Sequence, residues 1–473
     1  MGDVVLKSAV EQLAMLSARE ISPLELADEH IRQIERLNPQ LNALVDFDPE
    51  RVRAQAIALQ QSRTEQGPLH GLPMSVKASI AVAGHRCETG SLLNGGHIPS
   101  EDAVIVDRIR RAGAMVLGTT NCPEFLMAYE TDNRVYGRTS NPWDLSRTAG
   151  GSSGGESAAI AAGLSACGFG SDGGGSVREP AHFTGICALK PTPGRIPAVG
   201  HLPPCAGPFS ILGTLGPMAR TIGDVALLFR VLSGGFDGDP LGAPVPLRSP
   251  SREELLATPI GFLEDDGLVP ATAETRQAVQ DAVRSLRGRG FRVEPVSKRM
   301  IGLLEESRRL WWDFFVRCGA MLLAPEFLGR ESLLSPVFAD FIEIAHAQAP
   351  LSGDELLRVW VESDLLRGRV MVEMRECPVL LTPVCSVPAF RHGERSWNVG
   401  GQQVAYLDAM RYTQWFNLLG APAAVVPVGR SSEGLPIGLQ IAGRPYADEV
   451  VLGVAAAVER DFGYTAPPAA IRP

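Results

Sequence analysis

The alternation of hydrophobic and polar positions in the first quarter of the chain predicts helices and strands in turn. Ser22-Pro23-Leu24-Glu25 combines a capping box with a proline at the first helical position, which indicates a helix start. The pattern predicts helices from Pro23 to about Leu37, near 49–62 and, with Ser100 as the cap, over Asp102–Arg111. It predicts strands at Leu72–Val76, ending at Lys77, and at Ala114–Thr119. Such alternation favours an α/β layered sheet.

The second half of the chain returns to helical periodicity at 271–288 and again at 302–323. Between 300 and 375 the sequence is at its most aromatic and least strand-like. Strands are predicted near Val379–Thr382 and Ala423–Val428, the second after an apolar helix around Tyr412–Leu419. No internal repeat is visible, so a repeat architecture is not indicated.

Between about Asn94 and Gly216 the chain is rich in glycine, serine and proline, without a low-complexity repeat. A flexible linker would have this composition without apolar strands between its glycines. Here two apolar segments intervene, Ala158–Leu164 and Ile186–Leu189, and we interpret both as strands. We therefore expect the loop-rich centre of a site here and not a boundary between domains.

The composition narrows the class of protein. The 473 residues are 45% hydrophobic and 21% charged, which is typical of a globular protein. The net charge of −9, without a Lys/Arg-rich block, argues against a nucleic acid partner. No stretch approaches the roughly 20 apolar residues of a membrane span, and the first residues lack a secretory pattern. The eight cysteines form no CxxC pair, so we expect reduced thiols, no metal, no cofactor and a cytoplasmic protein.

Two glycine-rich segments carry the candidate chemistry, Gly150–Glu156 and Gly170–Arg178. A serine nucleophile needs a group that takes its proton, donors for the oxyanion, and a backbone that brings these close. The three glycines before Ser176 supply the last two, because residues without a Cβ let consecutive N–H groups converge. Each such donor typically stabilises a transition state by about 3 kcal/mol. Two ordinary tight turns are the alternative, and the paired serines with the upstream strand-end Lys77 argue against it.

Gly168–Gly173 also matches the dinucleotide fingerprint GxGxxG, which would make the protein a nucleotide-binding oxidoreductase. That motif needs a following helix and an acidic residue about 20 positions further on. Pro180 interrupts a helix early, and no Asp or Glu occurs from Pro180 through Gly223. The dinucleotide interpretation is therefore a minor alternative.

Gly151–Gly155 matches the GxSxG pattern of a nucleophile elbow, with Ser153 as the nucleophile. An elbow follows an apolar strand, whereas the preceding Asn141–Ala149 is polar and rich in turn formers. A Ser–His–Asp triad centred on Ser153 is thus a second minor alternative.

Several long segments together resemble the amidase signature family. After the two glycine-rich segments, the sequence continues as Pro180-Ala181, Gly185-Ile186-Cys187 and Leu189-Lys190-Pro191-Thr192. Gly71–Lys77 is similar to the family's lysine-bearing strand, and further matches lie at Gly216–Thr221, Phe416–Leu418 and Gly434–Gly438. The resemblance runs from about residue 6 to 460, with variable stretches near 235–260 and 300–400.

The resemblance implies an α/β fold, a single large α/β/α layered domain around a central mixed, mostly parallel twisted sheet. Within residues 1–473 we expect four parts, namely N-terminal helices at 1–65, the catalytic core at 66–225, a variable helical pocket region at 226–400, and a C-terminal part at 401–473 that completes the sheet.

The resemblance also assigns roles to residues. The catalytic lysine falls on Lys77, the serine that follows a cis peptide bond on Ser152, and the nucleophile on Ser176, 24 positions later. The implied oxyanion donors are the backbone amides of Gly173, Gly174, Gly175 and Ser176. Two further pairs are implied, the site-bracing Asp172 and Arg178 and the acyl-pocket residues Leu126 and Met127. No metal or other cofactor is implied.

The Ser–Ser–Lys arrangement is chemically coherent. A lysine acts as a base only when neutral, and its ordinary pKa is about 10.4. Burial at a strand end beside Val76 and Ile80 would lower the pKa of Lys77. Ser152 would then pass the proton of Ser176 to the lysine and later return it to the leaving amine. All three positions are filled, which argues against an inactive member of the family.

Other residues near these motifs admit two interpretations. His182 follows the second segment closely, and a structural role is favoured over a catalytic one. Four aromatic residues either line a substrate pocket or pack a helix, Trp311, Trp312, Phe314 and Phe315. Arg195 and His201 lie on a loop that could border the entrance.

The resemblance predicts cleavage of a C–N bond through an acyl-enzyme on Ser176, in a small-molecule amide, anilide or carbamate. Pro191–Pro197 and Gly207–Ser210 are similar to broad-specificity bacterial amidases and fatty-acid-amide-hydrolase-like members, some of which cleave urethanes. The A subunit of a tRNA-dependent amidotransferase is an alternative with partner subunits. Those members usually carry a tyrosine where Pro193 stands. We expect a monomer or a homodimer.

Overall fold

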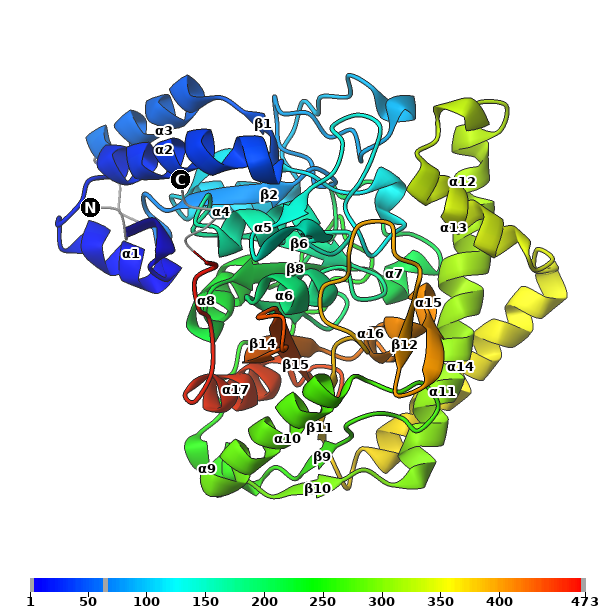
Figure 1. Ribbon diagram of the computed structural model, residues 1–473. Coiled ribbons are helices and arrows are strands. Elements are labelled where there is room, and N and C mark those ends of the chain that lie inside the picture. Colours follow the sequence, from blue (N-terminus) through cyan, green and yellow to red (C-terminus); the bar gives the residue numbers. More distant parts are fainter. Residues whose placement is uncertain (1–3, 63–66, 469–473) are drawn as a thin grey trace.

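The computed structural model describes residues 4–62 and 67–468 and is built around one large mixed β-sheet (Figure 1). Among the described residues the sheet has 11 strands, drawn from the N-terminal, central and C-terminal parts of the chain, which makes it a single domain. In spatial order they are β1 (Leu44–Phe47), β3 (Met115–Thr120), β2 (Pro73–Lys77), β6 (Cys167–Asp172), β8 (Thr214–Ala219), β7 (Cys187–Lys190), β14 (Ala423–Arg430), β15 (Pro436–Gly443), β11 (Val379–Pro383), β9 (Ile260–Phe262) and β10 (Val293–Pro295).

The strands of this sheet run in both directions. Parallel pairs join β3 to β2, β2 to β6, β11 to β9 and β9 to β10. The other six neighbouring pairs are antiparallel. The α/β class and the mixed sheet are confirmed, whereas the expectation of a mostly parallel sheet is wrong. Strand–helix alternation predicts parallel crossovers, but the short loop 431–435 joins β14 to β15, and so short a loop permits only antiparallel neighbours.

The Ser22 capping box forms as predicted. Ser22 Oγ accepts a hydrogen bond from Glu25 N at 3.2 Å, and Glu25 Oε2 accepts one from Ser22 N at 2.8 Å. The helix that follows, α2 (Pro23–Leu41), runs one turn beyond the predicted end. It lies with α1 (Ala9–Ser17) and α3 (Pro49–Gln61) at one end of the molecule (blue in Figure 1).

Ser100 does not cap the next helix. The helix α4 (Val104–Arg111) begins after Ala103, whose side chain makes no capping hydrogen bond. Asp102, which was expected inside the helix, accepts a hydrogen bond from Ala83 N at 2.8 Å. The carboxylate thus anchors the preceding loop, and the helix begins two residues later than predicted.

Helices cover both faces of the sheet. On one face, α5 (Gly154–Ala161) and α6 (Arg178–Thr184) pack against the central strands. On the other lie α8 (Ile222–Leu232), α10 (Ala273–Gly288) and α17 (Asp448–Glu459). The neighbours Val425 and Val426 of β14 belong to the cores on opposite faces, as successive residues of a strand should.

The segment Ala158–Leu164 is not a strand, because most of it belongs to the helix α5. Every residue of α5 is buried, so the helix has no polar face to reveal its periodicity. The other apolar segment between the glycines does form a strand, β7. The hydrophobic pattern does not predict the strand β6, because Gly168 and Gly170 interrupt its apolar residues.

Residues 298–373 form a helical wall along one side of the sheet (yellow-green to yellow in Figure 1). It consists of α11 (Lys298–Trp312), a π-helical turn (Asp313–Arg317), α12 (Cys318–Phe327), α13 (Pro336–His346) and α14 (Gly353–Glu373). The predicted helix at 302–323 therefore exists but is interrupted by the π turn. Against the wall lie the hairpin β12 (Ser396–Val399) and β13 (Gln402–Ala405), α15 (Tyr406–Ala409) and α16 (Arg411–Leu418).

The remaining described elements are short. They are the 3₁₀ turns Val4–Leu6, Leu92–Asn94, Glu124–Leu126 and Glu331–Leu333, the strands β4 (Ser140–Asn141) and β5 (Asp144–Thr148), and the helices α7 (Phe209–Leu212) and α9 (Arg252–Ala257). In the ranges that the structure describes, no helix has the length and apolar character that crossing a membrane requires.

Candidate active site

Lys77 is the last residue of β2, and its side chain is completely buried. Its Nζ donates to Ser152 Oγ at 2.6 Å and to Ser171 Oγ at 3.1 Å. Ser171 lies in β6, which pairs with β2, so the sheet itself brings these two side chains together. The structure thus joins two residues that the resemblance singled out, and adds Ser171, which it did not.

Burial lowers the pKa of Lys77 to about 8, while Cys122, Asp172 and Glu156 act in the opposite direction. A lysine with this pKa is partly neutral near neutral pH, and a neutral amine has the lone pair that a base needs. The expected burial at the strand end is therefore present, and its electrostatic consequence has the predicted sign.

Glu156 is a second buried ionisable residue, close enough to Lys77 to affect its pKa. Ser75 Oγ donates to its Oε1 at 2.5 Å and Thr120 Oγ1 to its Oε2 at 2.8 Å. Burial raises the pKa of Glu156 to about 7 in spite of these two hydrogen bonds. A Cβ on Gly168 would lie 1.9 Å from Glu156 Oε1. The first glycine of the apparent dinucleotide fingerprint therefore lies within a strand and makes room for this carboxyl group.

Ser152 projects from a tight loop that precedes α5. The Gly151–Ser152 peptide bond is cis, and Gly150 has a φ of +88°. A Cβ on Gly150 would approach the backbone of α6 to 2.7 Å, so the loop packs directly on that helix. Ser153 N donates to the Ser176 carbonyl at 3.1 Å, which ties this loop to the turn that carries the predicted nucleophile.

Ser153 is placed differently from Ser152. It is fully buried, its Oγ lies 3.4 Å from the Ser171 carbonyl, and a Cβ on Gly170 would touch it at 2.3 Å. Ser152 and Ser176 line the pocket described below, and Ser153 does not. This geometry disfavours the nucleophile elbow.

Ser176 lies in the turn between β6 and α6, after Gly175 with a φ of +128°. Only 7% of it is exposed. Within the described part of the chain, the N–H groups of Gly173, Gly174 and Ser176 donate to no protein acceptor. The N–H of Gly175 instead donates to Asp172 Oδ1 at 2.8 Å. Three of the four predicted oxyanion amides are thus unoccupied, and the fourth holds the turn.

The carbonyl groups of the same glycines are held from outside the turn. Trp311 Nε1 donates to the Gly173 carbonyl at 2.8 Å. Tyr129 Oη and Thr413 Oγ1 donate to the Gly174 carbonyl at 2.8 and 2.7 Å. Because a peptide unit is planar, fixing a carbonyl also fixes the N–H of the next residue. No motif identified Tyr129 or Thr413, which lie far from Ser176 in the sequence.

Asp172 and Arg178 form a fully buried ion pair beside this turn. Arg178 Nη2 lies 2.8 Å from Asp172 Oδ1, and its Nε lies 3.0 Å from Oδ2. Burial alone would raise the pKa of Asp172, but Arg178 outweighs it and holds that pKa well below its usual range. Arg178 also donates to Gln440 Oε1 at 2.6 Å and to Asn417 Oδ1 at 2.5 Å. The predicted bracing pair therefore links the turn to C-terminal segments.

Two pockets meet at Ser176. The inner pocket is lined by apolar residues, mainly Phe125, Pro203, Pro204, Phe209 and Leu323, and reaches Ser152. The outer pocket is lined mainly by Tyr129, Trp311, Phe341, Tyr406 and Leu407. Leu126, Met127 and Phe315 border both. The predicted acyl-pocket residues Leu126 and Met127 thus lie beside Ser176, on the walls of both pockets.

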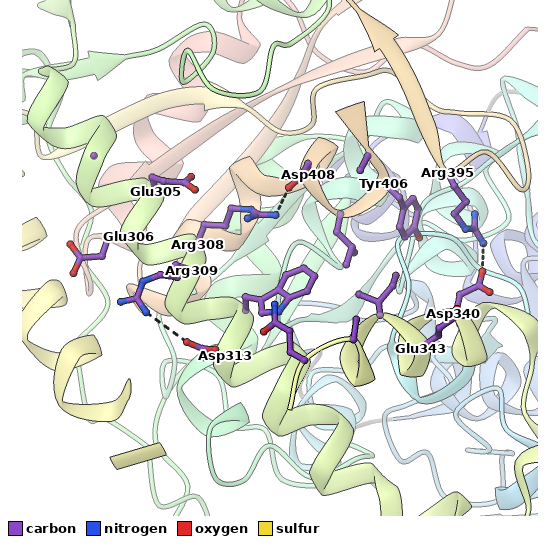
Figure 2. Close-up of a pocket in the computed structure, with 17 residues that line it drawn as sticks. Glu305, Glu306, Arg308, Arg309, Asp313, Asp340, Glu343, Arg395, Tyr406 and Asp408 are labelled. Atoms are coloured by element: carbon purple, nitrogen blue, oxygen red, sulfur yellow. Dashed lines mark hydrogen bonds and ion pairs between the residues drawn. The ribbon is translucent and has the colours of Figure 1, made fainter. Parts of the chain in front are cut away.

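The outer pocket adjoins a charged cavity of about 1170 Å³, here called the vestibule, whose lining residues Figure 2 shows. Five residues line both cavities, namely Asp340, Ile344, Arg395, Tyr406 and Leu407. At their junction Arg395 lies 3.2 Å from Asp340 and 2.7 Å from Glu130, with its guanidinium over the Tyr406 ring. Charged vestibule residues come from α11, α13 and the opposite rim, namely Glu305, Glu306, Arg308, Arg309, Asp313, Asp340, Glu343, Arg395 and Asp408. Acidic side chains therefore outnumber basic ones at this entrance.

The remaining candidates separate into structural and pocket residues. His182 is fully buried, with ring nitrogens at 3.2 Å from the Val387 carbonyl and 2.8 Å from Gly438 N. Arg195 pairs with Asp448 and Glu449 and lines neither pocket. His201 borders the inner pocket and not the vestibule.

The four aromatic residues of the wall divide in the same way. Trp311 and Phe315 stack at 4.8 Å and line the outer pocket. Trp312 faces the vestibule. Phe314 points to the other side of the helix and packs edge-on against Trp360 at 5.4 Å. The π turn shifts the helical register here, as π-bulges often do at functional sites.

The chain belongs to the amidase family, whose family model, described as Amidase, matches residues 25–452. Acylamidase of Rhodococcus erythropolis is 35% identical over 464 residues, which cover 96% of this chain and 94% of that protein. Indoleacetamide hydrolase of Bradyrhizobium diazoefficiens is 32% identical over 471 residues, covering 97% and 87%. The A subunit of glutamyl-tRNA(Gln) amidotransferase from Roseiflexus sp. is 31% identical, covering 95% and 96%.

Solved structures agree with this membership. A 6-aminohexanoate cyclic dimer hydrolase in complex with substrate superposes with a TM-score of 0.85 at 27% identity, over 98% of this chain and 99% of that one. A bacterial aryl acylamidase of the amidase signature family gives 0.82 at 28% identity, over 96% of each chain. The amidase signature resemblance is confirmed, and the protein is an amidase hydrolase acting on C–N bonds.

Proposed function

We propose that the protein hydrolyses neutral amides with apolar substituents, using Ser176 as nucleophile, Ser152 as proton relay and Lys77 as base. The observation that carries this proposal is the 2.6 Å hydrogen bond between Lys77 Nζ and Ser152 Oγ, on a loop tied to Ser176. It places a buried amine of lowered pKa one hydroxyl group away from the pocket that contains Ser176.

In the first half of the reaction, neutral Lys77 accepts the proton of Ser152 as Ser152 accepts that of Ser176. Ser176 Oγ attacks the carbonyl carbon, and the tetrahedral intermediate collapses when Ser152 returns a proton to the leaving nitrogen. In the second half a water molecule attacks the acyl-enzyme, losing its proton along the same relay. The carboxylic acid then leaves and Ser176 regains its proton.

The unoccupied amides of Gly173, Gly174 and Ser176 are the proposed oxyanion donors. The carbonyl groups in the same peptide units as these amides already accept hydrogen bonds: that of Asp172 from Asn417 Nδ2, that of Gly173 from Trp311 Nε1, and that of Gly175 from the N–H of Glu179. Little reorganisation is therefore needed when charge develops on the substrate oxygen. Gly175 is a poorer donor candidate than the resemblance implied, because Asp172 already accepts its N–H. We assign Gly175 to shaping the turn.

The pockets support an apolar group on each side of the scissile bond. The inner pocket has Phe209, Phe315 and Leu323 on its walls, and the outer pocket has Trp311 and Phe341. The relatives' names point in the same direction, since one is an acylamidase and one structural neighbour is an aryl acylamidase. We therefore propose anilides and aryl or alkyl amides as the substrate class, with aryl carbamates as the nearest chemical variant.

A substrate panel tests this proposal. Purified protein is assayed with an anilide, a long-chain amide, an aryl carbamate and glutamine, alongside Ser176→Ala and the matched control Ser153→Ala. We expect anilide hydrolysis that Ser176→Ala abolishes and Ser153→Ala retains. Ammonia release from glutamine alone among these substrates would contradict the proposal and favour the amidotransferase alternative.

A further inference from the structure

Beneath the turn that carries Ser176 lies a carboxyl group that the hydrolytic mechanism does not use. Glu179, in the first turn of α6, is completely buried. Its backbone N–H donates to the Gly175 carbonyl at 2.7 Å. Its Oε1 lies 3.1 Å from Thr413 Oγ1, and its Oε2 has no nitrogen or oxygen partner among the described residues. The side chain thus contacts Thr413, which holds the turn, and lines neither pocket.

The contacts of Thr413 constrain the protonation state of the Glu179 carboxyl group. Thr413 Oγ1 lies 2.7 Å from the Gly174 carbonyl, 2.9 Å from the Met410 carbonyl and 3.1 Å from Glu179 Oε1. Carbonyl oxygens only accept, and the hydroxyl group has a single proton. The shortest contact, to Gly174, requires that proton. The contact to Glu179 is then a hydrogen bond only if the carboxyl group supplies the proton itself.

The surroundings of Glu179 favour the protonated form. The charged and titratable groups that face it are Arg178 on its own helix, Asp172 at the end of β6, Tyr129, and the Cys385 thiol. Arg178 is already paired with Asp172, so little of its charge is left to stabilise a second carboxylate. Burial is the main cause that holds the pKa of Glu179 well above its usual value, and Asp172 acts in the same direction.

We propose that Glu179 is a positioning residue, a neutral carboxylic acid that donates to Thr413 and so lets Thr413 hold the Gly174 carbonyl. The proposal rests on the proposed role of Ser176 as nucleophile. If Glu179 ionised, Thr413 would turn its proton to the carboxylate, and Gly174 would keep only its bond from Tyr129. The Gly174–Gly175 peptide, one peptide unit before that of the nucleophile, would then be held only by Tyr129 at its carbonyl and by Asp172 at its N–H. Such a loss affects the rate of attack and not substrate binding.

Infrared difference spectroscopy tests the protonation state without any substrate. Glu179→Gln keeps the size and the hydrogen-bonding ability of the side chain and removes its carboxyl group. We expect the wild-type minus Glu179→Gln spectrum at neutral pH to contain the carbonyl band of a buried, protonated carboxylic acid. Carboxylate bands in its place would overturn the proposal. This result does not depend on activity, so it stands apart from any failure of the proposed function.

The rate of Ser176 labelling by a fluorophosphonate tests the positioning role. Thr413→Val removes the hydroxyl group at constant shape and should slow labelling about tenfold, the equivalent of one hydrogen bond. Thr413→Ser and Glu179→Gln keep the donors and should label within about twofold of wild type. At alkaline pH, ionisation of Glu179 should slow the labelling of wild type. Glu179→Gln cannot ionise and should show no such decrease. Equal slowing in Thr413→Ser and Thr413→Val would overturn the proposal.

Discussion

The catalytic centre and the helical wall treat charged side chains in opposite ways. In the centre, Arg178 and Asp172 are both fully buried and held by partners from several segments. On the wall, Arg309 and Glu362 pair at the surface with side chains 54% and 49% exposed. Buried pairs are costly to break, whereas exposed pairs contribute little to stability. The proposed catalytic centre is therefore held by contacts made between distant segments of the fold, and the wall mainly lines the cavity.

Apolar residues show the same difference. Apolar side chains of the centre are almost all buried. On α14, in contrast, Leu357, Val361 and Leu365 are each more than half exposed to solvent. A wall that tolerates such exposure has fewer packing constraints on its sequence. Changes in the centre should thus affect catalysis or stability severely, and changes on the wall should affect specificity.

Removing the base should have the largest effect. Lys77→Ala deletes the proposed proton acceptor and should lower kcat by about 10⁴-fold, measured with the anilide that wild type hydrolyses best. Lys190→Met is a matched control, because Lys190 is also buried but, among the described residues, its side chain donates a hydrogen bond only to the Pro191 carbonyl. The control should retain most of kcat. Equal losses in both variants would mean that Lys77 matters only for packing.

The two ion pairs should differ sharply in stability. Arg178→Met leaves Asp172 buried without its partner and should reduce the free energy of unfolding by about 3–5 kcal/mol. Arg309→Met on the wall should reduce it by less than about 1 kcal/mol. Urea denaturation followed by circular dichroism measures both. Similar values for the two variants would remove the distinction between centre and wall.

The pH dependence of kcat/KM should report Lys77. In the proposed mechanism the active form is the neutral amine of Lys77, whose pKa is lowered to about 8. Below that pH, kcat/KM should rise about tenfold per pH unit, and it should level off above about pH 8. A kcat/KM profile that is flat from about pH 6 to about pH 9 would exclude a lysine of this pKa as the base.

The wall should show a smaller effect, on substrate binding. Phe315→Ala removes an aromatic surface from both pockets and should raise KM about tenfold for an anilide, with little change in kcat. Its neighbour Phe314 packs on Trp360 away from the pockets, so Phe314→Ala should reduce stability and leave KM unchanged. Equal changes in KM would place the pocket elsewhere.

The sequence revealed the site better than the fold around it. Glycine spacing and the family resemblance predicted Lys77, Ser152 and Ser176 as the site, because such motifs are local and long. The structure places Ser152 and Ser176 on one pocket and Lys77 behind them, bonded to Ser152. The helix α5 was mistaken for a strand because it is buried on all sides. The antiparallel centre of the sheet was missed because strand order depends on pairings between distant segments.

The residues that hold the catalytic turn could not be identified from the sequence. Thr413, Tyr129 and Trp311 donate to carbonyls of Gly173 and Gly174 from three distant segments. A threonine or tyrosine in a helix or loop carries no pattern of its own, and only the folded chain reveals what it contacts. The split between Phe314 and Phe315 likewise depends on a π turn that periodicity does not reveal.

Mapping the covalent adduct of a fluorophosphonate tests the central claim most directly. The wild-type protein is labelled, digested and analysed by mass spectrometry, with Ser176→Ala and Ser153→Ala treated in parallel. We predict a single adduct on Ser176, present in Ser153→Ala and absent from Ser176→Ala. An adduct on Ser153, or undiminished labelling of Ser176→Ala, would contradict the assignment of the nucleophile.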